Sequence, residues 1–368
     1  MPAAAVAGQM SPLGSAPAQG TGTIVPFFYG TNQYVEKIAV NTQTLTTTAV
    51  EFQTNINPGG FLRGVRLEVR SSGGALGGGA LSADAPAAVV QTASLENIDG
   101  SPIVYPMAGF AHHIGQWFFR PWWGDPTRRF DYSATVNPSF SLFMQPELRQ
   151  TAGVLANTDA RALYRIRWTY CTLATLVVGG APTAPAVTVT AYMESWAQPD
   201  SNDLRGNPIE ELPPGLNLAT LRRQQIINLA AAGADNTLQL SNMGNELRGI
   251  MFITRNSSGV RADLFNDPIR WRIDNRSLGV FTNQEVFNRM SDQYESLQNG
   301  STRPTGVYVF PRWYDPGRMV GESWLATTNA TYVIFETSTA AGGTSGTAQI
   351  VTDEVVPVGP VPMELESI

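Results

Sequence analysis

Hydrophobic and polar side chains alternate along most of this 368-residue chain. Alternation places successive side chains on opposite faces of a β-strand, so one face lies on a core and the other faces solvent or a neighbour. The pattern therefore predicts half-buried antiparallel strands, and Asp99-Gly100 predicts a tight hairpin turn between two of them. The predicted strands lie near residues 50–53, 61–70, 95–98, 103–105, 139–144, 164–170, 187–194, 238–240, 250–252, 271–273, 307–310, 332–335 and 350–356.

One segment near the C-terminal end has a helical pattern instead. Thr282 and Glu285 have the spacing of a capping box, in which each side chain bonds a free backbone N–H group of the first turn. The apolar residues that follow recur on one stripe, and Gly300 suits the left-handed conformation that ends a helix. The sequence therefore predicts a helix from Asn283 to Gln298, between two strands.

The strand pattern is interrupted between residues 198 and 215, where prolines and acidic residues gather as in a linker between domains. The first 24 residues are small and uncharged, and the last ten contain two prolines, so both ends are predicted to be tails. We predict a flexible arm over 1–24, two all-β domains over 25–205 and 206–358, and a C-terminal tail over 359–368. Long Gly- and Pro-rich connections favour sandwiches over up-and-down barrels.

The composition of the chain excludes several classes of protein. Charged residues make up 15% of the chain and hydrophobic residues 43%, which excludes global disorder. The net charge of −6 argues against nucleic-acid binding, which needs a basic face. Lys37 is the only lysine and follows no Gly-rich turn, so a phosphate-binding loop of the Walker type is excluded.

Cys171 is the only cysteine, which excludes an intrachain disulfide and a Cys-rich metal site. It lies in an alternating segment, so we expect a small buried hydrophobe. The N-terminus has no basic residue and no apolar core of a signal peptide. The uncharged segment 168–193 is broken by Gly and Pro, which favours two strands and a loop over a membrane span.

Few residues suggest chemistry. His112 and His113 are adjacent, and on a strand they would point to opposite faces, so we expect a structural role rather than a shared metal. The sequence has no nucleophile elbow and no zinc-binding helix motif. The adjacent acids at 210–211 and 353–354 make poor acid–base pairs across a substrate. We therefore predict no enzymatic activity, no cofactor and no metal.

An aromatic cluster is the most conspicuous candidate site: Trp117, Phe118, Trp122 and Trp123 lie close together with Arg and Asp. Exposed aromatic side chains of this kind stack on sugars, as in a lectin. Large aromatics are more often buried under a loop or in a subunit interface, and we favour that interpretation.

The order of several segments resembles the major capsid proteins of tectiviruses, which are tailless phages with an internal membrane. Leu95–Gly100, followed by His112-His113 and Trp117-Phe118, is similar to the central strand pair and helix-like connection of that family. Further similar segments, spread over about residues 40–357, are Gly153–Asn157 between two strands, Val187–Pro199 at the end of the first half, the helix that ends at Gln298, Arg303–Tyr308 and Tyr314–Pro316.

The resemblance implies a double jelly roll: an all-β chain of two tandem eight-stranded jelly-roll sandwiches with one or two short helices. It implies a structural major capsid protein whose homotrimers form pseudo-hexagonal capsomers of an icosahedral virion with an internal membrane. The implied partners are neighbouring capsomers, vertex (penton) proteins, minor capsid proteins and, through the N-terminal arm, the inner membrane, with no nucleic acid. The protein would be made in the host cytoplasm and reside in the virion.

Two other functions stay open at this point. A carbohydrate-binding jelly roll or host-attachment spike would use the aromatic cluster to bind glycans. A β-sandwich glycoside hydrolase would need two carboxylates on opposite sides of a glycosidic bond, and no pair stands out.

Overall fold

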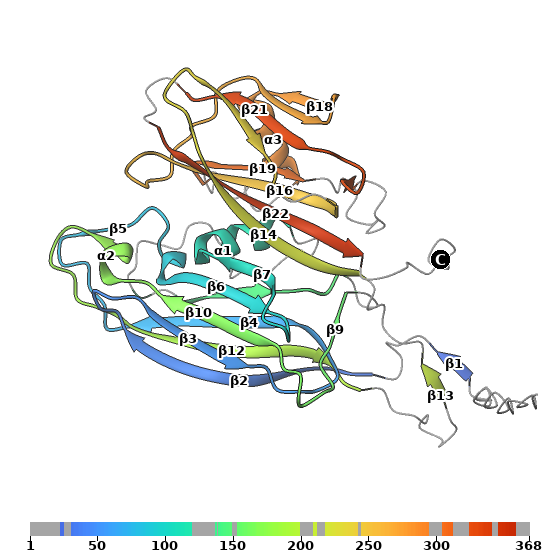
Figure 1. The fold of residues 1–368 in the computed structure, drawn as a ribbon. Coiled ribbons are helices and arrows are strands. Elements are labelled where there is room, and N and C mark those ends of the chain that lie inside the picture. The colour runs from blue at the N-terminus through green and yellow to red at the C-terminus, as the bar shows by residue number, and fades with distance from the viewer. Residues whose placement is uncertain are drawn as a thin grey trace, which may run out of the picture.

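The computed structural model describes residues 23–25, 31–119, 137, 139–148, 153–198, 209–211, 218–241, 244–293, 304–311, 324–340 and 345–357. Over these residues the chain consists mainly of antiparallel β-strands in two groups, which lie one above the other in Figure 1. No helix in this part of the chain is long and apolar enough to cross a membrane. The predicted all-β class is confirmed.

The first group of strands forms two sheets that face each other across a core. One sheet has the order β2-β12-β4-β8 and the other the order β3-β10-β6-β7. Counted along the chain, these are main strands one, eight, three and six, and then two, seven, four and five, which is the jelly-roll order. The bounds are β2 (Gln33–Thr44), β3 (Val50–Asn55), β4 (Phe61–Ser72), β6 (Val90–Glu96), β7 (Pro102–Met107), β8 (Ser139–Met144), β10 (Arg165–Tyr170) and β12 (Ala186–Trp196).

The second group repeats this order. Its sheets are β14-β22-β16-β19 and β15-β21-β17-β18, again strands one, eight, three and six, and two, seven, four and five. The double jelly roll that the resemblance implied is therefore present. The bounds are β14 (Leu218–Asn228), β15 (Asp235–Gln239), β16 (Glu246–Arg255), β17 (Ile269–Ile273), β18 (Arg276–Phe281), β19 (Val307–Pro311), β21 (Val333–Ser338) and β22 (Thr347–Pro357).

The alternating residues fill the cores of the two rolls. On β4, Leu67 is fully buried while its neighbour Glu68 is half-buried, as a period of two requires. In the second roll the Phe335 ring packs against Phe252 at 4.7 Å and Trp271 at 5.0 Å between centroids. Burial of each such side chain stabilises the fold by about 1.5–3 kcal/mol, so these rows hold the facing sheets together.

Several short elements complete the described chain. The parallel pair β1–β13 joins the end of the predicted N-terminal arm to the predicted linker, so Thr23 and Ile24 lie in a strand rather than in a tail. The pair β5–β11 lies at a loop end of the first roll, while β9 extends β4 and β20 extends β16. The bounds are β1 (Thr23–Val25), β5 (Ala80–Leu81), η2 (Ala87–Val89), β9 (Leu155–Ala156), α2 (Leu173–Leu176), β11 (Val177–Val178), β13 (Ile209–Glu211) and β20 (Leu325–Ala326).

Two longer helices, α1 (Gly109–Phe118) and α3 (Asn283–Gln293), lie outside the sheets. Helix α3 begins at the predicted residue, and the Glu285 N–H donates to the Thr282 hydroxyl at 3.2 Å. The Glu285 carboxylate accepts from Arg289 instead of completing the capping box. The predicted end at Gln298 lies outside the described residues. Helix α1 has no counterpart among the elements that periodicity predicted.

Every strand that alternation predicted is present. The hairpin turn is confirmed as well, because the Gly100 N–H donates to the Asn97 carbonyl at 2.9 Å and Gly100 has a φ of +83°. The segment 168–193 contains β10 and β12, with α2 and β11 in the connection between them. Cys171 is buried with 1% exposure, as expected. Among the main strands, β2, β14 and β18 were not predicted, and neither were the short strands β1, β5, β9, β11, β13 and β20.

Candidate functional site: the junction between the two rolls

The predicted aromatic site is only partly described. Phe118 is fully buried in the hydrophobic core at the end of α1, and the backbone of Trp117 lies in the same helix. Trp122 and Trp123 lie outside the described residues. The interface role of this cluster therefore stays a prediction.

The two histidines lie on α1, which corrects the assumption that they occupy a strand. Helical neighbours point about 100° apart, and here both side chains are buried, with His112 at 0% and His113 at 4% exposure. The His112 Nε2 atom lies 2.8 Å from the Ala93 carbonyl oxygen, so Nε2 donates and anchors α1 to β6. No cluster of potential metal ligands occurs in the described part of the chain.

The rolls meet where β14 of the second lies beside β7 of the first. The two strands are parallel, with Arg222 opposite Val104, and they join a sheet of each roll into one continuous sheet. The Gln224 side chain donates to the Pro106 carbonyl at 2.5 Å, and the Thr220 N–H donates to the Pro146 carbonyl at 3.0 Å. Backbone and side chain together therefore fix β14 on the first roll.

Behind this contact lies a buried ionic group that we call the Asp353 cluster, formed by Asp353, Arg222 and Arg248. Asp353 has no exposure; its carboxylate accepts from Arg248 Nε at 2.6 Å and from Arg222 Nη2 at 3.4 Å. Burial lowers the pKa of Arg222, and the charge of Asp353 opposes that shift. A charge taken out of water needs such a partner, since an unpaired buried ion is costly.

Helix α1 faces the same arginine. The Arg222 guanidinium lies 5.6 Å from the centre of the Phe119 ring, just after the helix. Burial lowers the pKa of His112 to about 4; the hydrogen bond to Ala93 opposes this shift and the positive charge of Arg222 adds to it. His112 is therefore neutral at neutral pH, which lets it lie near a buried cation.

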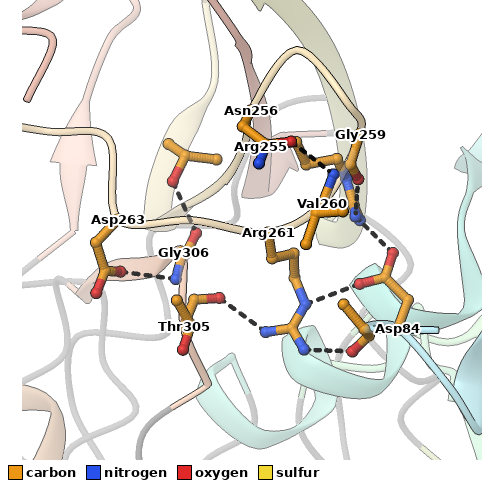
Figure 2. A network of polar contacts seen from close by, with 11 residues as sticks. Asp84, Arg255, Asn256, Gly259, Val260, Arg261, Asp263, Thr305 and Gly306 are labelled. Carbon is orange, nitrogen blue, oxygen red and sulfur yellow. Dashed lines mark hydrogen bonds and ion pairs between the residues drawn. The ribbon is translucent and has the colours of Figure 1, made fainter. Parts of the chain in front are cut away.

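A second ionic group crosses between the rolls, and Figure 2 shows it as sticks. This Asp84 bridge consists of Asp84 of the first roll with Arg255 and Arg261 of the second. Asp84 accepts from Arg261 Nε at 2.8 Å and lies 2.6 Å from Arg255 Nη1. Arg261 also donates to the carbonyls of Ala83 and Thr305, and burial lowers its pKa.

The loop that carries Arg261 is held by local bonds. The Asn256 side chain accepts from the backbone N–H groups of Ser258 and Val260 at 3.0 Å, and Gly259 has a φ of +76°. These bonds close a turn between Asn256 and Gly259, in which the Gly259 N–H donates to the Asn256 carbonyl at 2.9 Å. The loop brings the Arg261 guanidinium to 4.2 Å from the centre of the Phe110 ring of α1, where a cation is attracted to the ring face.

The junction joins surfaces and does not resemble a reaction centre. The acids at 353–354, considered above as a catalytic pair, are structural: Glu354 lies 3.3 Å from Arg223 Nη1, and Asp353 belongs to its own cluster. Glu210 and Glu211 lie in β13. No local pattern marks Asp84, because its partners are about 170 residues away along the chain.

Comparisons with known proteins place this fold. Neither family models nor curated proteins match the sequence. Solved structures do match. The major capsid protein of Sulfolobus turreted icosahedral virus is 14% identical with a TM-score of 0.62, over 92% of this chain and 100% of that chain. The PBCV-1 protein VP54 is 12% identical with a TM-score of 0.56, over 88% and 94%.

The major capsid protein of bacteriophage PM2 is 9% identical with a TM-score of 0.50, over 88% of this chain and 97% of that one. At these identities the comparisons establish the fold, and they do so over most of each chain. The structural neighbours are double jelly-roll major capsid proteins of viruses with different hosts.

Proposed function

We propose that this protein is the structural major capsid protein of an icosahedral virus with an internal membrane, and that it has no enzymatic activity. One observation carries the proposal: two rolls of identical strand order are joined edge to edge, in a fold that viral major capsid proteins share over most of their length. Two rolls joined through a shared sheet suit a building block. The rolls occupy residues 25–205 and 206–358 in this proposal.

The capsomer is proposed to be a homotrimer. Each chain supplies two similar bodies, so three chains around a three-fold axis supply six, which gives a pseudo-hexagonal outline that tiles a flat facet. The low content of charged residues, 15%, supports extensive contacts with other subunits, because covered surface needs fewer charges than wet surface. Neighbouring capsomers, vertex proteins and minor capsid proteins are the proposed partners, and nucleic acid is not among them.

One end of the molecule is proposed to face the virion interior. The strand ends that border the arm, the linker and the tail gather there, because Trp196 pairs with Gln33 and Leu218 pairs with Pro357. The Trp196 indole donates to Glu147 at 2.9 Å, and the neighbouring Pro146 accepts from Thr220 of β14. The uncharged arm would then reach the membrane without burying a charge.

Light scattering and electron microscopy of the purified protein test this function. We expect a particle of about 119 kDa, three times the chain mass of 39.7 kDa, and hexagonal plates at high concentration. Deletion of residues 2–20 should leave trimers but impair shell assembly. A stable monomer at micromolar concentration would contradict the proposal. Glycan binding that is lost in Trp122→Ala would favour the alternative of a host-attachment protein.

A further inference from the structure

The contact between the two rolls of one chain pairs the edge strands of two sheets. Strand β14 is the first strand of its roll and lies at the edge of its sheet, next to the last strand, β22. Strand β7 is the fifth main strand of the first roll and lies at the edge of the other type of sheet. The junction therefore joins a first-strand edge to a fifth-strand edge, in parallel.

One edge of each type remains unused. Strand β2 is the counterpart of β14 and pairs only with β12 among the described strands. Strand β18 is the counterpart of β7, and within the described chain its one pairing partner is β17. In Figure 1, β2 lies at the bottom of the molecule and β18 at the top, so the two edges of one chain lie on opposite flanks.

Both unused edges expose apolar side chains. Val35 and Val40 on β2 are 58% and 52% exposed, and Val280 on β18 is 58% exposed. A long strand edge with unpaired N–H and C=O groups and exposed valines attracts another strand, and proteins normally protect or use such an edge. Neither edge contains a proline, and the charged residues are few: Glu36 and Lys37 on β2, and Arg276 on β18.

We propose that β18 of one copy docks in parallel along β2 of the next copy, so that the contact between chains repeats the junction within each chain. The inference rests on the proposed function, since it assigns the surfaces that build the trimer. A head-to-tail contact closes into a ring when its rotation permits. Three chains would then form a ring of six rolls in which β14–β7 and β2–β18 contacts alternate.

The intrachain junction also predicts the register. Arg222 is the fifth residue of β14 and lies opposite Val104, the third residue of β7. The corresponding residues of the unused edges are Lys37 in β2 and Leu278 in β18. Counting back two residues from each of these places Val35 opposite Arg276.

Cysteine cross-linking tests the contact and its register in the full-length protein. The background is low because Cys171 is buried, and burial raises the pKa of its thiol to about 12. The variant Val35→Cys/Arg276→Cys should form disulfide-linked dimers and trimers on oxidation, since neighbouring strands lie about 4.8 Å apart, within the range of about 4.4–6.8 Å that a disulfide spans between Cα atoms. The matched control Val35→Cys/Val280→Cys shifts one cysteine by four residues, about 13 Å, and should stay uncross-linked.

The outcomes separate this inference from the proposed function. Cross-linking of the registered pair but not of the control supports it. A trimer by light scattering in which neither pair cross-links overturns the β2–β18 contact while the capsid function stands. Equal cross-linking of both pairs would overturn the parallel register. If light scattering shows only monomers, the proposed function fails first and the inference fails with it.

Discussion

The Asp353 cluster and the Asp84 bridge have the same composition, one carboxylate between two guanidinium groups, but different surroundings. The side chain of Asp353 has no exposure, whereas that of Asp84 keeps 21%. The first group lies within the second roll, beneath the surface that meets α1, and the second spans the two rolls. The comparison predicts that burial sets how much the removal of one partner costs, while position sets what the group holds in place.

The difference follows from the cost of desolvation. Removal of one partner from a fully buried ion pair leaves the other charged group without water, which is much more costly than in a partly exposed pair. An exposed pair loses little, because water and salt ions replace the lost partner. Substitutions in the Asp84 bridge should therefore leave the protein folded, whereas substitutions in the Asp353 cluster should destabilise it strongly.

The largest effect is expected for Asp353→Asn. The change leaves Arg222 and Arg248 buried without a carboxylate, so the free energy of unfolding should fall by about 3–5 kcal/mol. Urea denaturation at fixed protein concentration measures it, with Asp84→Asn as the matched control. A loss no greater than that of the control would contradict the prediction that burial sets the cost of removing a charged partner.

Acid should lower the free energy of unfolding through His112, which lies near Arg222 of the Asp353 cluster. Its folded pKa of about 4 lies below the unfolded value of 6.5, so the unfolded chain binds more protons between these values. The stability contributed by neutral His112 is present above pH 6.5 and is lost as the pH falls towards 4, by about 3 kcal/mol in total.

His112→Gln removes this titration while keeping an N–H donor for the Ala93 carbonyl. The free energy of unfolding, measured by denaturation, should therefore fall less between pH 7 and pH 4 in the variant than in the unmodified protein. Parallel pH profiles would show that His112 does not carry the dependence.

A smaller loss is expected for Asp84→Asn, about 1–2 kcal/mol, between the values for exposed and fully buried pairs. A double-mutant cycle with Arg261→Lys measures the coupling, because lysine keeps the charge but loses the planar fork that reaches Asp84 and two carbonyls. Additive losses would mean that the carboxylate and the guanidinium do not act together across the rolls.

The smallest effect sets the exposed limit of the series. Glu285 and Arg289 form an (i, i+4) pair on α3, with side chains 40% and 44% exposed. Glu285→Gln should lower the free energy of unfolding by about 0.5 kcal/mol or less, and high salt should remove the difference. A loss as large as that of Asp84→Asn would show that exposure does not order these three groups.

The sequence predicted the strands that show a buried apolar face or a continuous buried apolar run, such as β4 and β16, and missed those that show neither. Strand β4 is buried at every second residue over much of its length, and its pattern was found. Strand β2 exposes Val35 and Val40, and β14 buries Arg222, so their hydrophobic pattern does not mark a single buried face. Helix α1 is buried on several sides, from Phe110 to Gln116, and thus lacks the polar stripe that identifies a helix.

The junction was beyond prediction for a different reason. Asp84 and Arg261 look like ordinary charged residues of loops, and only the fold brings them together. Asp353 was noticed for its acidic neighbour, but the two arginines that define its role lie on other strands. Local patterns report how a segment is buried; they carry no information on which distant segment covers it.

The continuous sheet through β7 and β14 has a consequence for the order of folding during synthesis. All main strands of the first roll lie between residues 33 and 196, so the ribosome completes them before β14 emerges at residue 218. That roll closes only when its last strand, β12, pairs with its first, β2. We expect the N-terminal half to fold first, as domains commonly do during translation, and the finished edge of β7 to serve as the template on which the second half begins.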